Sequence, residues 1–205
     1  PGASMIDVPA LRPMTEVAAE LGIAAEHVIG WGPDRAKIDL AALVDRPPTG
    51  RLILVSAITP TPSGEGKTTM AIALAMGMRA RGRHAVLALR EPSLGPVFGM
   101  KGGGTGGGAA TIEPAEAINL HFTGDLHAIT TAHNLLSALV DNSVQFGSPG
   151  PIDPRRVTWP RAIDMNDRFL RRVVIGLGGP ADGIPRESGF QITASSEVMA
   201  ALCLA

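Results

Sequence analysis

A glycine-containing loop with a single lysine carries the strongest chemical signal in the chain. It lies between a continuous apolar run and a helix-forming stretch. In that setting backbone N–H groups and a helix N-terminus cradle phosphates, the lysine reaches the β- and γ-phosphates, and a Ser or Thr hydroxyl binds Mg²⁺. Lys67 is predicted to be catalytic and Thr68 to hold Mg²⁺; the alternative is an ordinary glycine turn before a helix. The predicted nucleotide-binding residues are Thr61, Pro62, Ser63, Gly64, Glu65, Gly66, Lys67, Thr68 and Thr69, and only Thr61, where the general pattern has glycine, departs from it.

A second candidate is Arg90, which directly follows another apolar run at 85–89. In an open α/β sheet the ligand crevice lies at the carboxyl ends of the strands, so Arg90 and Lys67 are expected to meet at one site. A guanidinium fork suits bidentate contact with phosphate or carboxylate. Arg90 is therefore predicted to be catalytic, and the alternative is a surface salt bridge with Glu91 or another acid.

Two further segments are weaker candidates for substrate binding. The glycine run 102–108, which includes Gly103 and Gly104, could let backbone amides approach an anion, or it could simply be mobile. Sequence alone leaves both readings open.

The segment 121–127 brings His121, Asp125 and His127 close to the predicted phosphate site, with Glu91 as a further acid. Such groups could bind a metal or a small acid, or transfer protons. His121, His127 and His133 recur every six residues, which does not place them on one helix face, so a zinc site is not predicted. For each histidine the alternative is a buried, hydrogen-bonded structural residue.

The elements that must position these residues follow from the apolar pattern. The runs 52–58 and 85–89 are continuous, as expected of strands buried on both faces of a parallel sheet, and the stretch 67–80 between them favours a helix. Strand, helix and strand form a βαβ unit. The predicted fold is α/β and P-loop-containing, with a mostly parallel sheet and helices on both faces. Residues 1–50 are predicted to form a helical or extended segment, and 51–205 the nucleotide-binding domain.

The rest of the chain supplies further elements. A helix is expected around 161–170, and an apolar helix after an N-cap at Ser196 that stops at Ala205 suggests a piece of a longer protein. Residues 91–108 are expected to be irregular. The other predicted elements are helices at 14–21 and 126–140 and strands at 118–122, 173–177 and 190–194.

Composition narrows the classes of partner. The net charge of −1 gives no basic excess for nucleic acid or a membrane surface. Cys203 is the only cysteine, so no disulfide can form within the chain, and a reducing, cytoplasmic compartment is expected. No apolar run reaches the roughly 18 residues that span a bilayer. The residues before Met5 lack a charged region followed by an apolar one, so no signal peptide is predicted.

Several segments in one order resemble the formate–tetrahydrofolate ligase family. The loop resembles that family's P-loop, which has threonine at the first position, so the mismatch at Thr61 becomes a match. The likeness runs from about Arg12 to the last residue. Two departures are Ala109 and Ala110 after the glycine run, and Ala117 where an acidic residue is expected. The segments that carry the resemblance are 59–69, 88–99, 118–125, 132–136, 152–156, 164–168 and 185–187.

The resemblance implies that ATP, formate and tetrahydrofolate give 10-formyltetrahydrofolate, ADP and phosphate through formyl phosphate. Lys67 would then hold the β- and γ-phosphates, Thr68 would place Mg²⁺, and Arg90 would clamp formate and formyl phosphate. The surrounding groups could include a site for K⁺ or NH₄⁺. The resemblance also implies a homo-oligomer when full length and a folate-binding region beyond Ala205, so the 205-residue piece alone is expected to be inactive in formyl transfer.

Two other classes of protein remain possible interpretations of the sequence. A P-loop ATPase switch of the partitioning or septum-placement type would have a second lysine near the start of the loop, and residues 59–63 contain none. The second class is a nucleotide-binding piece without catalysis. ATP hydrolysis and 10-formyltetrahydrofolate formation, assayed separately, discriminate between these classes.

Overall fold

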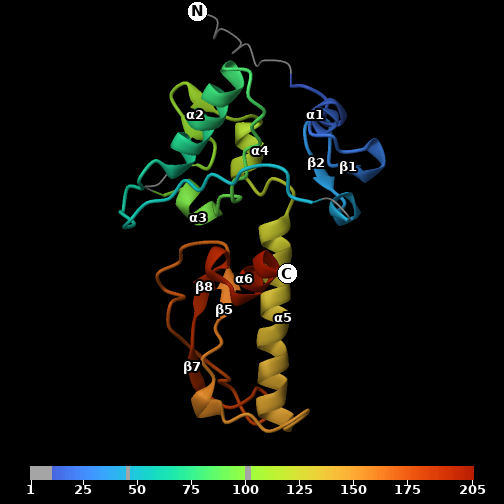
Figure 1. Ribbon diagram of the computed structural model, residues 1–205. Coiled ribbons are helices and arrows are strands. Elements are labelled where there is room, and N and C mark those ends of the chain that lie inside the picture. Colours follow the sequence, from blue (N-terminus) through green and yellow to red (C-terminus); the bar gives the residue numbers. More distant parts are fainter. Residues whose placement is uncertain (1–10, 45–46, 100–102) are drawn as a thin grey trace, which may run out of the picture. The chain divides into compact units, whose positions relative to one another are not determined.

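The computed structural model describes residues 11–44, 47–99 and 103–205 and contains both helices and small sheets (Figure 1). The predicted mixture of helices and strands is confirmed. Residues 1–4, for which no signal peptide is predicted, lie outside the described residues. No helix in the part of the chain that the structure describes is both long and apolar enough to span a bilayer. The described residues divide into two compact units.

Unit 1 contains the described residues up to Thr59, together with Gly66–Leu87 and Thr105–Ala117. Helix α2 packs against the small antiparallel hairpin of β3 and β4 and buries Ile72 there. A second antiparallel hairpin joins β1 and β2. The elements are α1 (Met14–Glu20), η1 (Ala25–His27), β1 (Val28–Gly30), β2 (Ala36–Ile38), η2 (Leu40–Leu43), α2 (Lys67–Ala80), β3 (Gly106–Gly107) and β4 (Ala110–Thr111).

Unit 2 contains Pro60–Glu65, the described residues of Ala88–Gly104, and Ile118–Ala205. Its long helix α5, yellow in Figure 1, packs against β5 and α6. Strands β5 and β8 pair in parallel, and β6 and β7 are antiparallel. The elements are α3 (Leu94–Val97), α5 (Asp125–Phe146), η3 (Pro154–Arg156), β5 (Arg161–Ile163), β6 (Val173–Ile175), β7 (Arg186–Ser188), β8 (Phe190–Ile192), η4 (Thr193–Ser195) and α6 (Glu197–Leu204); α4 (Ala115–Asn119) crosses the boundary between the units.

The prediction of two buried strands, at 52–58 and 85–89, is wrong. Both segments lack strand structure, and the side chains of Leu52 and Ile58 are fully exposed, at 94% and 105% of their reference area. A strand forms only when another segment accepts and donates its backbone hydrogen bonds. Among the described residues no segment pairs with either run, so the large, mostly parallel sheet is also absent from this part of the chain. Apolar composition identified segments suited to burial but could not supply their partners.

Three local predictions also fail. Residues 118–122 do not form a strand, because the helix α4 occupies Ala115–Asn119. The segment 161–170 begins with the strand β5 rather than a helix, since β8, far away in sequence, pairs with it. The span 91–108, expected to be irregular, contains the short helix α3 and the strand β3.

The helices with clear end signals are confirmed. Helices α1, α2 and α5 form where predicted, and Gly82, at φ 71°, follows the end of α2. Ser196 caps α6, because its hydroxyl accepts the backbone N–H of Val198 at 3.1 Å. The predicted strands near 173–177 and 190–194 correspond to β6 and β8.

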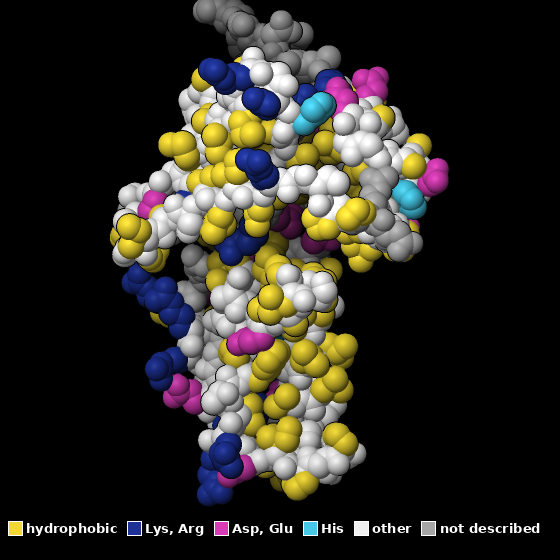
Figure 2. Space-filling view, in the orientation of Figure 1, with side chains coloured by type: hydrophobic (Ala, Val, Ile, Leu, Met, Phe, Trp, Pro, Cys, Tyr) yellow, Lys and Arg dark blue, Asp and Glu magenta, His cyan; other side chains and the backbone are white. Residues whose placement is uncertain are grey.

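Apolar side chains remain on the surface of unit 2. Leu135, Leu139 and Phe146 of α5 are exposed, and Figure 2 shows hydrophobic side chains gathered over this helix. On the opposite face of α5, His133 is fully buried. This imidazole stacks on Trp159 with 4.6 Å between ring centroids. The face of α5 that carries His133 is therefore the one that packs into the unit.

Both ring nitrogens of His133 have partners. Nε2 lies 2.9 Å from the carbonyl oxygen of Pro160, and Nδ1 lies 2.9 Å from the hydroxyl of Ser196. Because a carbonyl can only accept, Nε2 carries the proton and donates it. The alternative proposed for His133 from the sequence, a buried and hydrogen-bonded structural histidine, is confirmed.

Replacing His133 with alanine is expected to lower the free energy of unfolding by about 2 kcal/mol, because two buried hydrogen bonds and the stacking contact with Trp159 are lost. Chemical denaturation of the full-length protein measures this change. His127→Ala is the control, since His127 lies on the same helix but is exposed. Equal stability of the two variants would contradict the structural role of His133.

Candidate functional site

The phosphate-loop segment takes its shape from two glycines. Gly64 has φ 85° and Gly66 has φ 71°, a left-handed conformation that a side chain would strain. The N–H of Gly64 donates to the carbonyl of Thr61 at 3.2 Å, and the N–H of Thr61 donates to the carboxylate of Glu65. The loop residues before the helix thus form a closed turn with the backbone held by its own hydrogen bonds.

Gly66 is the N-cap of α2, and its carbonyl accepts the N–H of Met70 at 2.8 Å. Lys67 is the first helical residue and is exposed, and Thr68 follows it half-buried. The first N–H groups of any helix have no acceptor within the helix, and they carry the positive end of its dipole. An anion placed at this end meets backbone donors, a lysine and a threonine hydroxyl from one short segment. Binding of a nucleotide phosphate at this helix N-terminus stays a prediction.

The acidic and imidazole candidates come together within unit 2. The N–H of Leu126 at the start of α5 donates to Oε2 of Glu91 at 3.4 Å, which brings the loop after residue 90 to the segment 121–127. His121 and His127 lie with their ring centroids 6.4 Å apart. Asp125 accepts the hydroxyl of Thr123 and interacts electrostatically with Glu91. Glu91, His121, Asp125 and His127 thus form one cluster, the acid–imidazole cluster.

Glu91 is the electrostatically unusual member of the acid–imidazole cluster. Burial raises the pKa of its carboxyl above the ordinary value, and the negative charge of Asp125 raises it further. The backbone N–H groups of Leu126 and Phe122 and the nearby His121 lower this pKa. The oxygen Oε1 of Glu91 is buried and has no hydrogen-bond partner among the described residues. A buried acceptor of this kind is where a cation or a donor from a ligand would be stabilised.

Asp164 is a site residue that the sequence prediction did not select, although it lies within a segment that resembles the family. It directly follows β5 and is 7% exposed. Its carboxylate accepts the hydroxyl of Ser93 and the N–H of Leu94, the latter at 2.9 Å, and it lies 2.9 Å from Nε2 of His121. No local pattern could have found it, because its partners are 43 to 71 residues away in the chain.

The glycine run makes close contacts where it is described. The N–H of Gly104 donates to the side-chain oxygen of Asn119 at 2.8 Å, and a Cβ at Gly103 would lie 2.4 Å from that side chain. Gly106, at φ 88°, belongs to the hairpin of β3 and β4, where a Cβ would lie 2.0 Å from the carbonyl oxygen of Ala110. Gly106 is therefore required by the hairpin, whereas a side chain at Gly103 would displace the side chain of Asn119. Direct contact of Gly103 or Gly104 with an anion stays a prediction.

Arg90 is exposed and lies in unit 2, one residue before Glu91. It does not follow a strand, because the segment 85–89 is not one. Lys67 belongs to unit 1, so the meeting of Arg90 and Lys67 at one site stays a prediction.

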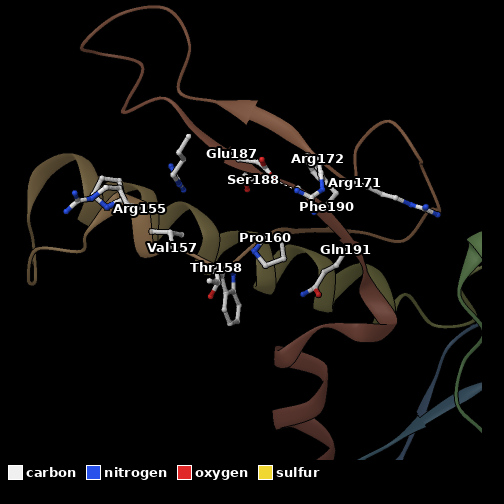
Figure 3. Close-up of a pocket in the computed structure, with 14 residues that line it drawn as sticks. Arg155, Val157, Thr158, Pro160, Arg171, Arg172, Glu187, Ser188, Phe190 and Gln191 are labelled. Atoms are coloured by element: carbon white, nitrogen blue, oxygen red, sulfur yellow. Dashed lines mark hydrogen bonds and ion pairs between the residues drawn. The ribbon is translucent and has the colours of Figure 1, made fainter.

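A cavity of about 560 Å³ in unit 2 lies elsewhere, between η3 and the hairpin of β6 and β7 (Figure 3). Four arginines line it, but three of them pair with carboxylates: Arg155 with Asp153, Arg172 with Glu187, and Arg186 with Asp141. In Figure 3 the head group of Arg155 points away from the cavity. The predicted site residues do not line this cavity. Within 11–44, 47–99 and 103–205 there is no group of three or more His, Cys, Asp or Glu side chains arranged to hold a metal ion.

Comparison with known proteins gives a consistent result. The family model described as formate–tetrahydrofolate ligase matches residues 4–205. A formate–tetrahydrofolate ligase of Myxococcus xanthus is 69% identical over 196 residues, 95% of this chain and 36% of the relative. Those of Maricaulis maris and Lacticaseibacillus paracasei are 59% and 55% identical over 198 residues, covering 95% and 96% of this chain. The chain thus spans about 36% of the length of the curated relatives it matches.

Proposed function

Because this chain belongs to the formate–tetrahydrofolate ligase family, we propose that the full-length protein joins formate to tetrahydrofolate at the expense of ATP. The products are 10-formyltetrahydrofolate, ADP and phosphate, and the intermediate is formyl phosphate. The observation that carries the proposal is the glycine-shaped loop 61–66 leading into the N-terminus of α2 with Lys67 and Thr68 at its first positions. In this proposal the segment acts as a P-loop, within a P-loop fold of the full-length protein.

The chemistry explains the need for ATP. Formate is a poor electrophile because its carboxylate carries a full negative charge. Transfer of the γ-phosphoryl group to a formate oxygen gives an acyl phosphate, whose phosphate can leave when the amine of tetrahydrofolate attacks the carbon. The protein must hold two anions together and neutralise charge in the transition state.

Each candidate residue has a role in this scheme. Lys67 and the first N–H groups of α2 bind the β- and γ-phosphates, and the hydroxyl of Thr68 is a ligand for the Mg²⁺ that accompanies ATP. The guanidinium of Arg90 binds formate and then formyl phosphate through two parallel hydrogen bonds. Gly103, Gly104, His121 and His127 contribute to the surrounding substrate site.

The acid–imidazole cluster fits a monovalent cation. The buried, unpartnered Oε1 of Glu91 and the neighbouring carboxylate of Asp125 are oxygen ligands of the kind that K⁺ or NH₄⁺ takes, and their mutual repulsion needs a positive charge. Such a cation offsets the cost of keeping Glu91 ionised. It would supply positive charge close to the predicted phosphate chemistry, and these two side chains would hold it.

This assignment predicts a pH-dependent effect of K⁺ on stability. The folded-state pKa of Glu91 is raised by burial, so without a cation the contribution of Glu91 to stability is fully present below the unfolded pKa and is lost as pH rises through the folded pKa. A cation favours the ionised form. K⁺ is therefore expected to raise the melting temperature of the full-length protein at neutral pH, and to raise it less as pH falls through the raised pKa.

Thermal unfolding with and without K⁺ measures this effect, with Na⁺ at equal ionic strength as the salt control. Glu91→Gln is expected to abolish the K⁺-dependent shift, whereas Glu116→Gln, at an exposed position of α4, is expected to retain it. An unchanged K⁺ shift in Glu91→Gln would remove this glutamate from the cation site.

A nucleotide-binding protein without ligase activity is the competing function. The two are separated by assaying the full-length protein for ATP hydrolysis and for 10-formyltetrahydrofolate formation in parallel. The proposal predicts ADP release that requires formate together with tetrahydrofolate and matches the formyl product in amount. Steady ATP hydrolysis without the formyl product would favour the competing function.

A further inference from the structure

Asp164 makes three contacts that the proposed reaction does not yet use. One carboxylate oxygen accepts the hydroxyl of Ser93. The other accepts the N–H of Leu94 at 2.9 Å and lies 2.9 Å from Nε2 of His121. Asp164 thus ties the segment after Glu91 to the His121 segment from within unit 2, and its side chain is 5% exposed.

The contact with His121 fixes which ring nitrogen carries a proton. An ionised carboxylate can only accept hydrogen bonds, so Nε2 of His121 must be the donor. In the neutral ring Nδ1 then keeps its lone pair and can accept a hydrogen bond. The imidazole is half-buried at 22% side-chain exposure, so it is held by Asp164 while remaining accessible.

The backbone at His121 is also constrained. His121 is the one residue other than glycine with a positive φ, 58°, in the part of the chain described by the structure. Such a conformation persists only where the surroundings hold it, and such residues cluster at functional sites.

The segment that carries Asp164 lies close to the segment around Gly95. A Cβ at Gly95 would lie 2.9 Å from the backbone nitrogen of Asn166. Residues 95 and 166 therefore approach each other closely, and a side chain at position 95 would disturb the segment that carries Asp164.

We propose that Asp164 is a positioning residue for the ligase reaction, acting through His121. It holds the imidazole in the Nε2–H form within the acid–imidazole cluster, with Nδ1 available to accept a hydrogen bond from a bound substrate. This inference rests on the proposed function, because His121 matters only if substrates bind at this cluster.

The test is a double-mutant cycle on kcat in the full-length protein. Asp164→Asn preserves the shape of the side chain, but the amide has one acceptor oxygen for the three donors Ser93, Leu94 and His121. It is expected to lower kcat about tenfold, and His121→Ala about 10²-fold, while KM for ATP changes less than about twofold in both. If Asp164 acts through His121, the double variant is no slower than His121→Ala alone.

Two controls separate positioning from general damage. Asp167→Asn makes the same chemical change at an exposed position three residues away and is expected to leave kcat within about twofold of wild type. Thermal unfolding of each variant identifies any loss of folded protein. Ser93→Ala is a further variant, because it removes one hydrogen bond to Asp164 and leaves the contact between Asp164 and His121 in place. Ser93→Ala is expected to lower kcat less than Asp164→Asn.

The outcomes are distinct. Multiplying effects of Asp164→Asn and His121→Ala would show two independent roles and overturn the proposal, as would wild-type kcat in either single variant. In each of those cases an active wild-type enzyme would leave the proposed function standing. Absence of 10-formyltetrahydrofolate formation by the wild-type full-length protein would overturn both.

Discussion

Replacing Lys67 with alanine in the full-length protein is expected to lower kcat/KM for ATP by a factor of about 10² or more. Lys67 is the first residue of α2, directly after the left-handed Gly66, so its charge is carried by the helix end whose backbone N–H groups have no acceptor within the helix. The charge on the transferred phosphoryl group is spread over its oxygens in the transition state, so a missing cation weakens transition-state binding.

The measurement is steady-state turnover together with equilibrium binding of a non-hydrolysable ATP analogue. Lys37→Ala is the matched control, because it removes the same charge from strand β2, where Lys37 lies over the ring of Trp31. This control is expected to retain wild-type turnover. Wild-type binding and turnover in Lys67→Ala would remove the loop 61–69 from the nucleotide site.

The second large effect is expected at Arg90. Arg90→Lys preserves the positive charge but loses the planar fork that makes two parallel hydrogen bonds, so it is expected to behave like Arg90→Ala rather than like wild type. Both variants should lower kcat about 10²-fold with little change in ATP affinity, because Arg90 is assigned to formate and formyl phosphate.

Turnover at saturating ATP and varied formate measures this effect. Arg168→Lys, at an exposed position in unit 2, is the control for the substitution itself and is expected to retain wild-type kcat. Normal use of formate by Arg90→Lys would make a bidentate role untenable. A loss confined to ATP affinity would instead assign Arg90 to the nucleotide.

Local sequence signals predicted those helices that have clear end signals. Helix α2 begins after Gly66 and is followed by Gly82, both left-handed glycines, and Ser196 caps α6 as predicted. These signals act over four residues or fewer, so the sequence around each one is sufficient.

Strands were predicted less reliably: those near 173–177 and 190–194 form, but others do not, because the stability of a strand depends on its partners. The apolar run 52–58 has the composition of a buried strand, yet Leu52 is fully exposed and no described segment pairs with it. Strand β5 forms in a segment expected to be helical, since β8 lies alongside it in parallel. Pairing between segments about thirty residues apart in sequence is not visible in either segment alone.

The residues of the candidate site show the same difference between local and long-range signals. The loop 61–69 could be proposed as a nucleotide site from sequence because its chemistry would be contained in nine consecutive residues. The approach of Glu91 to the start of α5 shows that the acidic and imidazole candidates lie together, and their binding of a substrate stays a prediction. Asp164 could not be selected, because its importance appears only when Ser93, Leu94 and His121 converge on one carboxylate.

The central claim is that ATP activates formate as formyl phosphate, and isotope transfer tests it most directly. The full-length protein is supplied with ATP, tetrahydrofolate and formate labelled with ¹⁸O in both oxygens, and the phosphate product is analysed by mass. Attack of a formate oxygen on the γ-phosphorus leaves that oxygen on phosphate when the folate amine displaces it. The account predicts one ¹⁸O in each phosphate released, in step with 10-formyltetrahydrofolate formation. Unlabelled phosphate accompanying the formyl product would contradict it.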